Sequence, residues 1–157
     1  MGHTIMNKKC YPKNRWISNG FMADFYLWSE RHHIPFLRFC LKTLLGTQIP
    51  CKIPDALFMP HPYGIIVSAG CELGENVVLM QQVTLGGRDP HFNEETLTSA
   101  NFPKLKEGVY VGAGARILGP VNIGAWAIVG ANAVVTKDVP AGATVVGFNK
   151  IITKDGE

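Results

Sequence analysis

Aliphatic residues return at every sixth position through most of the second half of the chain. The series is interrupted once and comprises Val67, Leu73, Leu79 and Leu85, then Leu105, Val111, Ile117, Ile123, Val129 and Val135. A second small or aliphatic residue follows four positions after each of these residues, with one exception. This second series comprises Cys71, Val77, Val83, Val109, Ala115, Val121, Ala127, Ala133 and Val139. Helical and alternating-strand patterns have shorter periods, so neither explains this one. It is typical of a hexapeptide repeat.

Each hexapeptide is predicted to form one short strand and one corner, so that three repeats close a coil of a parallel β-helix. Glycine follows several of the first positions, where we expect a tight backbone corner: Gly74, Gly86, Gly112, Gly124 and Gly130. We therefore expect an all-β core over residues 49–147, with one long inserted loop at residues 86–104. A loop of that length is either a functional segment beside the active site or a tolerated surface insertion.

Two short helices are predicted before the repeats. Asn19 is the expected N-cap of a helix at about residues 21–32, whose apolar face carries Phe21, Phe25 and Trp28. A second helix over residues 35–45 begins with proline and ends at Gly46, which suits a left-handed residue after a helix. Its apolar residues need a partner surface: Phe36, Leu37, Cys40, Leu41, Leu44 and Leu45. We expect the two helices to cover one end of the coils.

Length and composition fit a single domain of this kind. The chain has 157 residues, and its 17 glycines exceed average usage. We divide it into an arm with short helices (1–48), the β-helix (49–147) and a tail (148–157). The net charge of +3 comes from scattered residues, which argues against nucleic acid as a partner. Charged residues interrupt every apolar stretch, so we expect no membrane span.

The cysteines and the N-terminus point to a reducing compartment. None of the four cysteines forms a CxxC pair, so we expect neither structural zinc nor any other bound metal. No apolar run follows Lys8 and Lys9, so we expect no secretory signal and a cytoplasmic protein.

One histidine occupies a position that the repeat otherwise gives to aliphatic residues. Counting back six from Val67 places His61 in the inward series, at the start of the regular coils. A neutral imidazole is an effective general base near neutral pH. The alternative is a structural histidine in an irregular first coil.

The motifs HPYGI, QQVTLGG, PKL, GAGARILG and GANAVVTKDVP stand between residues 61 and 140. With these motifs the chain resembles the serine acetyltransferase-like O-acetyltransferases of the hexapeptide acyltransferase superfamily, over more than half its length. The resemblance implies a left-handed β-helix and a homotrimer with active sites between subunits. It also implies that His61 removes the proton of an acceptor hydroxyl, which attacks acetyl-CoA directly without an acyl-enzyme.

The resemblance further implies a site for acetyl-CoA, the co-substrate, built largely from backbone groups at small residues. The matching positions are Gly86, Gly87, Ala113 and Ala131, and the N–H of Gly87 is a candidate oxyanion donor. Small side chains would let the pantetheine arm approach the backbone. Arg116 and Lys137 are candidates for the CoA phosphates, with simple surface solvation as the alternative.

The chain departs from the serine-specific pattern at two positions that the resemblance links to the amino-acid acceptor. Pro60 stands where those enzymes have aspartate, and Phe102 where they have histidine. Neither side chain can replace the missing hydrogen bonds or charge. We therefore favour a sugar or polysaccharide precursor as acceptor, with L-serine as the alternative, and with a non-catalytic β-helix scaffold as a third possibility.

In the family that the chain resembles, the carboxylate partner of the base is expected fifteen residues before the histidine. Here that position is Gly46, so the resemblance gives no clear carboxylate partner for His61. Substitutes within the chain are Asp55 and Asp89, and His91 could supply a second imidazole. The tail lacks the terminal isoleucine with which assimilatory serine acetyltransferases dock into cysteine synthase, so we do not expect that partner.

Overall fold

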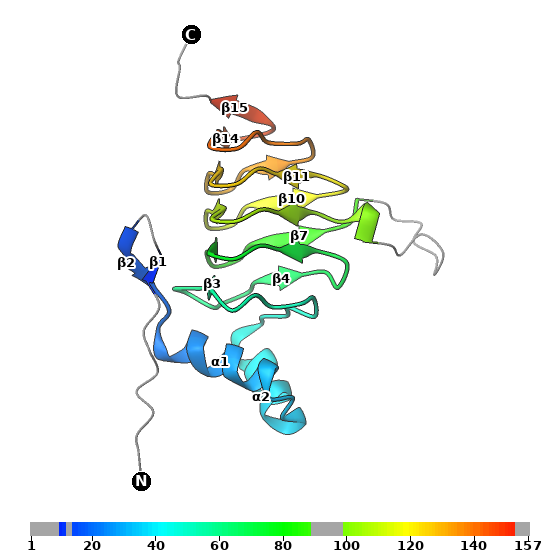
Figure 1. The fold of residues 1–157 in the computed structure, drawn as a ribbon. Coiled ribbons are helices and arrows are strands. Elements are labelled where there is room, and N and C mark those ends of the chain that lie inside the picture. Colours follow the sequence, from blue (N-terminus) through cyan, green and yellow to red (C-terminus); the bar gives the residue numbers. More distant parts are fainter. Residues whose placement is uncertain (1–9, 12–13, 89–98, 153–157) are drawn as a thin grey trace.

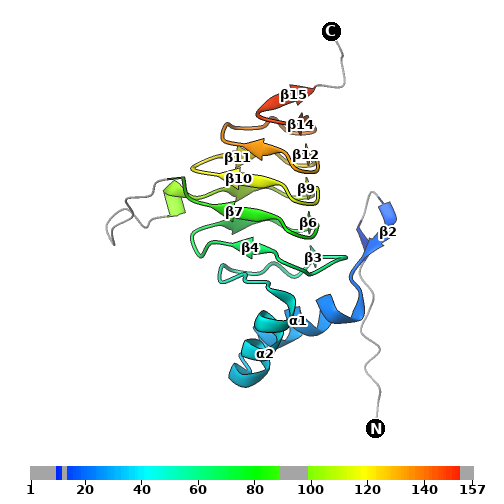
Figure 2. The same ribbon diagram turned by 180° about the vertical axis from the view of Figure 1, so that it is seen from behind.

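The protein is a stack of triangular coils with two helices at its N-terminal end (Figure 1). The computed structural model describes residues 10–11, 14–88 and 99–152. The same stack is seen from behind in Figure 2, where the helices again lie below the first coil. Hairpin strands β1 (Cys10–Tyr11) and β2 (Asn14–Ser18) pair antiparallel beside the first coils.

Three sheets form the walls of the coils, and all of their strand pairs are parallel except that of β14 with β15. Sheet 1 contains β4 (Ile66–Val67), β7 (Thr84–Gly86), β10 (Arg116–Leu118) and β13 (Val134–Val135). Sheet 2 contains β5 (Glu72–Leu73), β8 (Lys104–Leu105) and β11 (Asn122–Ile123). Sheet 3 contains β3 (Leu57–Phe58), β6 (Val77–Leu79), β9 (Tyr110–Val111), β12 (Ile128–Val129), β14 (Thr144–Val146) and β15 (Lys150–Ile152).

The register confirms the hexapeptide prediction. Val67 pairs with Leu85 and Ile117 with Val135, so one coil after another places the same repeat position in line. The predicted inward residues of both series are buried, except Leu73, which is partly buried. The parallel β-helix is therefore confirmed, while its left-handed sense stays a prediction from the resemblance.

The glycines after the first positions have a different cause from the one predicted. A Cβ on Gly112 would lie 2.6 Å from the backbone nitrogen of Ala131, and one on Gly124 would lie 2.3 Å from that of Ala141. Neither glycine has a positive φ. Gly112 and Gly124 need glycine because the next coil stacks directly on them, and not because the corner has a left-handed backbone.

Helix α1 (Phe21–Arg31) is present, but two details of its prediction are wrong. Gly20 is the N-cap, and the Asn19 side chain instead accepts a hydrogen bond from Met59 N at 2.6 Å and donates one to Leu57 O at 3.0 Å. The predicted aromatic face lies mostly outside the core. Its rings stack on one another along the helix, and Phe21 is 75% exposed, whereas the buried face carries Ala23, Tyr26, Leu27, Ser29 and Glu30.

Helix α2 (Pro35–Leu45) has the predicted bounds, and Gly46 follows it in the left-handed conformation with φ 61°. Leu41 and Leu45 are buried against the coils, but part of the predicted apolar face has no cover among the described residues. The exposed side chains are Phe36, Cys40 and Leu44, with Phe39 beside them. Within the described ranges, neither helix is long and apolar enough to cross a bilayer.

The last coil is closed by the segment predicted as a tail. Strand β15 turns back and pairs antiparallel with β14. Between them the Asn149 side chain donates to Thr136 Oγ1 at 2.8 Å and accepts from Thr136 N at 2.7 Å. The chain thus covers the open edge of sheet 3 with its own residues.

Candidate active site

The turn that carries His61 joins β3 to β4 and is longer than the corners above it. In the next coil, six positions separate Val78 from Thr84. Their partners, Phe58 and Ile66, are eight positions apart. Counting back by six therefore fails across this turn, and the inward position predicted for His61 is wrong. The two additional residues carry the imidazole out of the aliphatic series, and His61 is exposed.

Above this turn, one column of residues lies at equivalent corner positions of successive coils: Tyr63, Gln81, Ala113 and Ala131. The carbonyl of each of the first three accepts a hydrogen bond from the coil above, namely from Gln82 N, Gly114 N and Asn132 N at 2.8–2.9 Å. We call this side of sheet 1 the His61 edge. Two of the predicted acetyl-CoA residues, Ala113 and Ala131, lie on it one coil apart.

Sequence reasoning missed Gln81, which stands in this column between Tyr63 and Ala113. Its Oε1 atom is buried and has no hydrogen-bond partner among the described residues. The signal was present in the sequence, because glutamine is a polar residue inside the QQVTLGG motif.

The opposite side of sheet 1, which we call the loop edge, carries the other predicted residues. Gly86 ends β7 and Gly87 follows it, at the start of the inserted loop. Lys137 is exposed two coils above them at the same edge. The loop returns through the 3-10 turn η1 (Ser99–Asn101), which stands beside the stack in Figure 1. Asp89 and His91 lie outside the described residues.

Phe102 closes one end of a cavity of about 500 Å³ on the lower part of this edge. Its ring covers Gly70, where a Cβ would approach the ring to 2.2 Å, and it is 5% exposed. The cavity is lined by Gln48, Pro50, Ile66, Val67, Ser68, Ala69, Gly70 and Phe102. No ionisable side chain is among these lining residues.

Arg116 has backbone partners at the His61 edge. Its guanidinium donates to Gln82 O at 2.6 Å and to Gly114 O at 2.8 Å. These contacts tie two coils together at the corner beside Ala113. The guanidinium thus stabilises the corner by bonding to two backbone carbonyls, and a contact with a CoA phosphate stays a prediction.

Asp55 lies at a different corner from His61. Its backbone N–H donates to Glu75 Oε1 at 3.2 Å, and its carbonyl accepts from Arg31 at 3.1 Å. That corner joins sheets 2 and 3, whereas His61 stands where sheet 3 leads into sheet 1. The structure therefore does not bring this carboxylate to the candidate base. The described residues also contain no group of three or more His, Cys, Asp or Glu that could hold a metal ion.

Two buried thiols lie in the first coils. Burial raises the pKa of Cys51 to about 11 and that of Cys71 to about 12. At neutral pH both stay protonated, and only the thiolate is an effective nucleophile. Neither thiol is thus suited to form an acyl-enzyme.

Three comparisons relate this chain to known proteins. The family description "Bacterial transferase hexapeptide (six repeats)" matches residues 102–137. A serine acetyltransferase of Staphylococcus aureus is 36% identical over 157 residues, which is 99% of this chain and 62% of that protein.

Two solved structures are also similar. A serine acetyltransferase in complex with cysteine has a TM-score of 0.67 and 32% sequence identity, and the match covers 82% of this chain and 53% of that chain. A serine acetyltransferase in complex with CoA has a TM-score of 0.64 and 32% sequence identity, and the match covers 82% of this chain and 52% of that chain. The chain spans between 50% and 62% of the length of such curated relatives.

Proposed function

Because the chain belongs to the hexapeptide-repeat transferases and is homologous to serine acetyltransferases, we propose that it transfers an acetyl group from acetyl-CoA to an acceptor hydroxyl. The observation that carries this proposal is the exposed His61 on its lengthened turn, at the same edge of sheet 1 as the small residues Ala113 and Ala131. An exposed imidazole can reach a substrate, and small residues let an extended ligand lie close to the backbone.

In the proposed reaction, the imidazole of His61 accepts the proton of the acceptor hydroxyl while the oxygen attacks the thioester carbonyl. The oxyanion of the tetrahedral intermediate accepts a hydrogen bond from the Gly87 N–H. The intermediate then collapses, the carbon–sulfur bond breaks, and the sulfur leaves as CoA thiol with the proton from the imidazolium. The high pKa values of Cys51 and Cys71 support this direct transfer, because no thiolate is available there.

The division of the acetyl-CoA residues between two edges bears on assembly. Gly86 and Gly87 lie at the loop edge, whereas Ala113 and Ala131 lie at the His61 edge, across the width of sheet 1. A ligand in contact with both sets either crosses the sheet or lies between two copies of the chain. We propose the second arrangement, in a homotrimer whose subunits pair one edge with the other. The CoA complex of a similar protein supports acetyl-CoA as the co-substrate.

L-Serine is the acceptor that the relatives support, and it replaces the sugar as our first choice. A sugar hydroxyl stays a second candidate on one observation. Among the described residues that line the cavity beside Phe102 none has an ionisable side chain, whereas serine carries an ammonium and a carboxylate that need partners.

The experiment is CoA thiol release from acetyl-CoA, measured with L-serine, nucleotide sugars and short oligosaccharides. We expect release with one acceptor class and a loss of about a hundredfold or more in His61→Ala. His33→Ala is the matched control, because His33 is an exposed histidine in the turn between α1 and α2 and not in the turn that carries His61. Wild-type activity in His61→Ala would contradict the assignment of the base. Tight acetyl-CoA binding without release with any acceptor would contradict the transferase proposal.

A further inference from the structure

Thr47 is a fully buried polar residue at the junction between α2 and the first coil. It follows Gly46 and is 0% exposed. Its hydroxyl donates to Pro62 O at 2.7 Å and accepts from Ile65 N at 3.2 Å. These two backbone groups lie in the turn that carries His61. One side chain therefore holds this turn at two points.

The turn needs such a side chain because it has no complete coil beneath it. In the regular corners, a backbone carbonyl of the coil below accepts a hydrogen bond from a backbone N–H of the coil above. Below the His61 turn, the end of α2 supplies one such carbonyl, and Gly64 N donates to Leu45 O at 2.8 Å. The turn also bonds to itself, with Tyr63 N donating to His61 O at 2.8 Å. The Thr47 hydroxyl satisfies the two further groups, which would otherwise be buried without partners.

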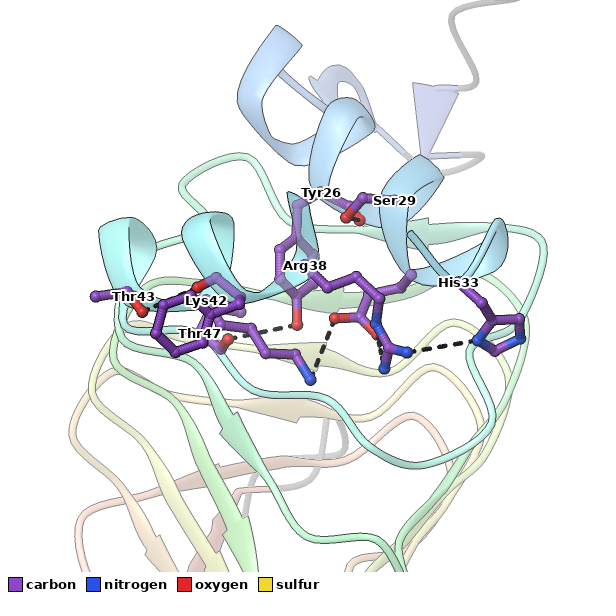
Figure 3. Close-up of polar contacts among 9 residues, drawn as sticks. Tyr26, Ser29, His33, Arg38, Lys42, Thr43 and Thr47 are labelled. Atoms are coloured by element: carbon purple, nitrogen blue, oxygen red, sulfur yellow. Dashed lines mark hydrogen bonds and ion pairs between the residues drawn. The ribbon is translucent and has the colours of Figure 1, made fainter. Parts of the chain in front are cut away.

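Thr47 is itself held by α1. The Tyr26 hydroxyl donates to Thr47 O at 3.4 Å, as Figure 3 shows. Burial, with the nearby Glu30 carboxylate, raises the pKa of Tyr26, so its hydroxyl keeps its proton for this bond. A continuous polar path thus runs from α1 through Thr47 to the turn.

We infer that Thr47 is a positioning residue for His61: its hydroxyl fixes the lengthened turn and thereby the place of the candidate base. This inference rests on the proposed function for its kinetic consequence, but not for its structural one. A displacement of about 1 Å at a catalytic group can cost up to a hundredfold in rate. A buried hydroxyl that is hydrogen-bonded directly to the turn of the histidine can therefore control turnover without touching substrate.

The test compares three variants. Thr47→Val keeps the shape and removes the hydroxyl, and we expect kcat to fall about ten- to a hundredfold while KM for acetyl-CoA stays within about twofold. Thr47→Ser keeps the hydroxyl and should restore most of kcat. Ser29→Ala is the matched control, since Ser29 is also 0% exposed and donates to a backbone carbonyl, Tyr26 O, at 2.8 Å, but does not touch the turn.

A second measurement does not depend on activity. The ring resonances of the five histidines can be followed by NMR, and the His61 signal is identified by its loss in His61→Ala. We expect Thr47→Val to shift or broaden this signal, and Ser29→Ala to leave it unchanged. The inference is overturned if Thr47→Val keeps the wild-type kcat and His61 signal, or if Ser29→Ala reproduces both effects. Absence of turnover in the wild type would count against the proposed function alone, because the resonance comparison still decides the role of Thr47.

Discussion

The regular coils and the N-terminal end of the molecule are stabilised in different ways. In the coils the buried side chains are apolar and mostly aliphatic or small, and backbone groups form hydrogen bonds from one coil to the next. At the N-terminal end, polar side chains are buried as well. The buried polar residues of the described chain are Ser29, Glu30 and Thr47, all in or just after the helices. A repeat can supply a rigid wall, but holding one irregular turn in place takes directional bonds from individual side chains.

The largest effect expected from this difference is the loss of folding when a charge enters the coils. Ile117→Asp places a carboxylate at a 0% exposed position on β10, where the surrounding side chains are aliphatic. A buried unpaired charge costs several kcal/mol, about the stability of a whole domain. We expect no cooperative thermal unfolding transition. Ile128→Asp is the control, because Ile128 is 44% exposed on β12 and should unfold like wild type.

The next effect tests how closely the coils stack. Gly124→Ala brings a Cβ within 2.3 Å of Ala141 N, so the backbone must shift. We expect a loss of about 3 kcal/mol in the free energy of unfolding, measured by urea denaturation. In Gly86→Ala the nearest neighbour is Ser68 Oγ at 3.5 Å, an ordinary contact, and the loss should stay below about 1 kcal/mol. Equal losses in the two variants would mean that stacking is not what requires glycine.

The same difference explains what the sequence could predict. The β-helix follows from a strict period, and α2 from its proline and Gly46, because these are local signals. His61 was placed wrongly because two additional residues in a turn are invisible to counting. Asn19 and Thr47 have partners 15 to 40 positions away, and a single sequence does not show such contacts. Arg116 was predicted to contact a phosphate, and the sequence did not show that its guanidinium donates to the Gln82 carbonyl of the neighbouring coil.

A smaller effect is the loss in free energy of unfolding when an ion pair is broken, which should differ between the two regions. Glu30 has a 4% exposed side chain and lies 2.7 Å from Arg38 and 3.4 Å from Lys42 (Figure 3). Glu30→Gln should cost about 1–2 kcal/mol, since both cations are partly solvated. On the coil surface, Glu72 and Lys104 lie 2.8 Å apart, but the Glu72 side chain is 52% exposed. Glu72→Gln should cost less than about 0.5 kcal/mol. Urea denaturation of both variants in low and high salt measures the difference, and a reversed order would contradict it.

An effect of about the same size as the difference between the two ion pairs is a dependence of the free energy of unfolding on alkaline pH, carried by one buried thiol in each region. Burial raises the pKa of Cys71, in the coils, to about 12, and that of Cys51, at the N-terminal end, to about 11. In the unfolded chain a thiol ionises near pH 8.5. Above that pH the unfolded state releases its proton while the folded state keeps it, so the stabilising contribution present at lower pH is lost as pH rises toward the folded value.

We therefore expect the free energy of unfolding of the wild type, relative to that of Cys71→Ala, to fall by about 1 kcal/mol between pH 8 and 9.5. A fall of the same sign is expected relative to Cys51→Ala, because burial raises the pKa of that thiol as well. Cys40→Ala is the control, since Cys40 is exposed, and a pH-independent difference for Cys71→Ala would show that its thiol is hydrated in the folded protein.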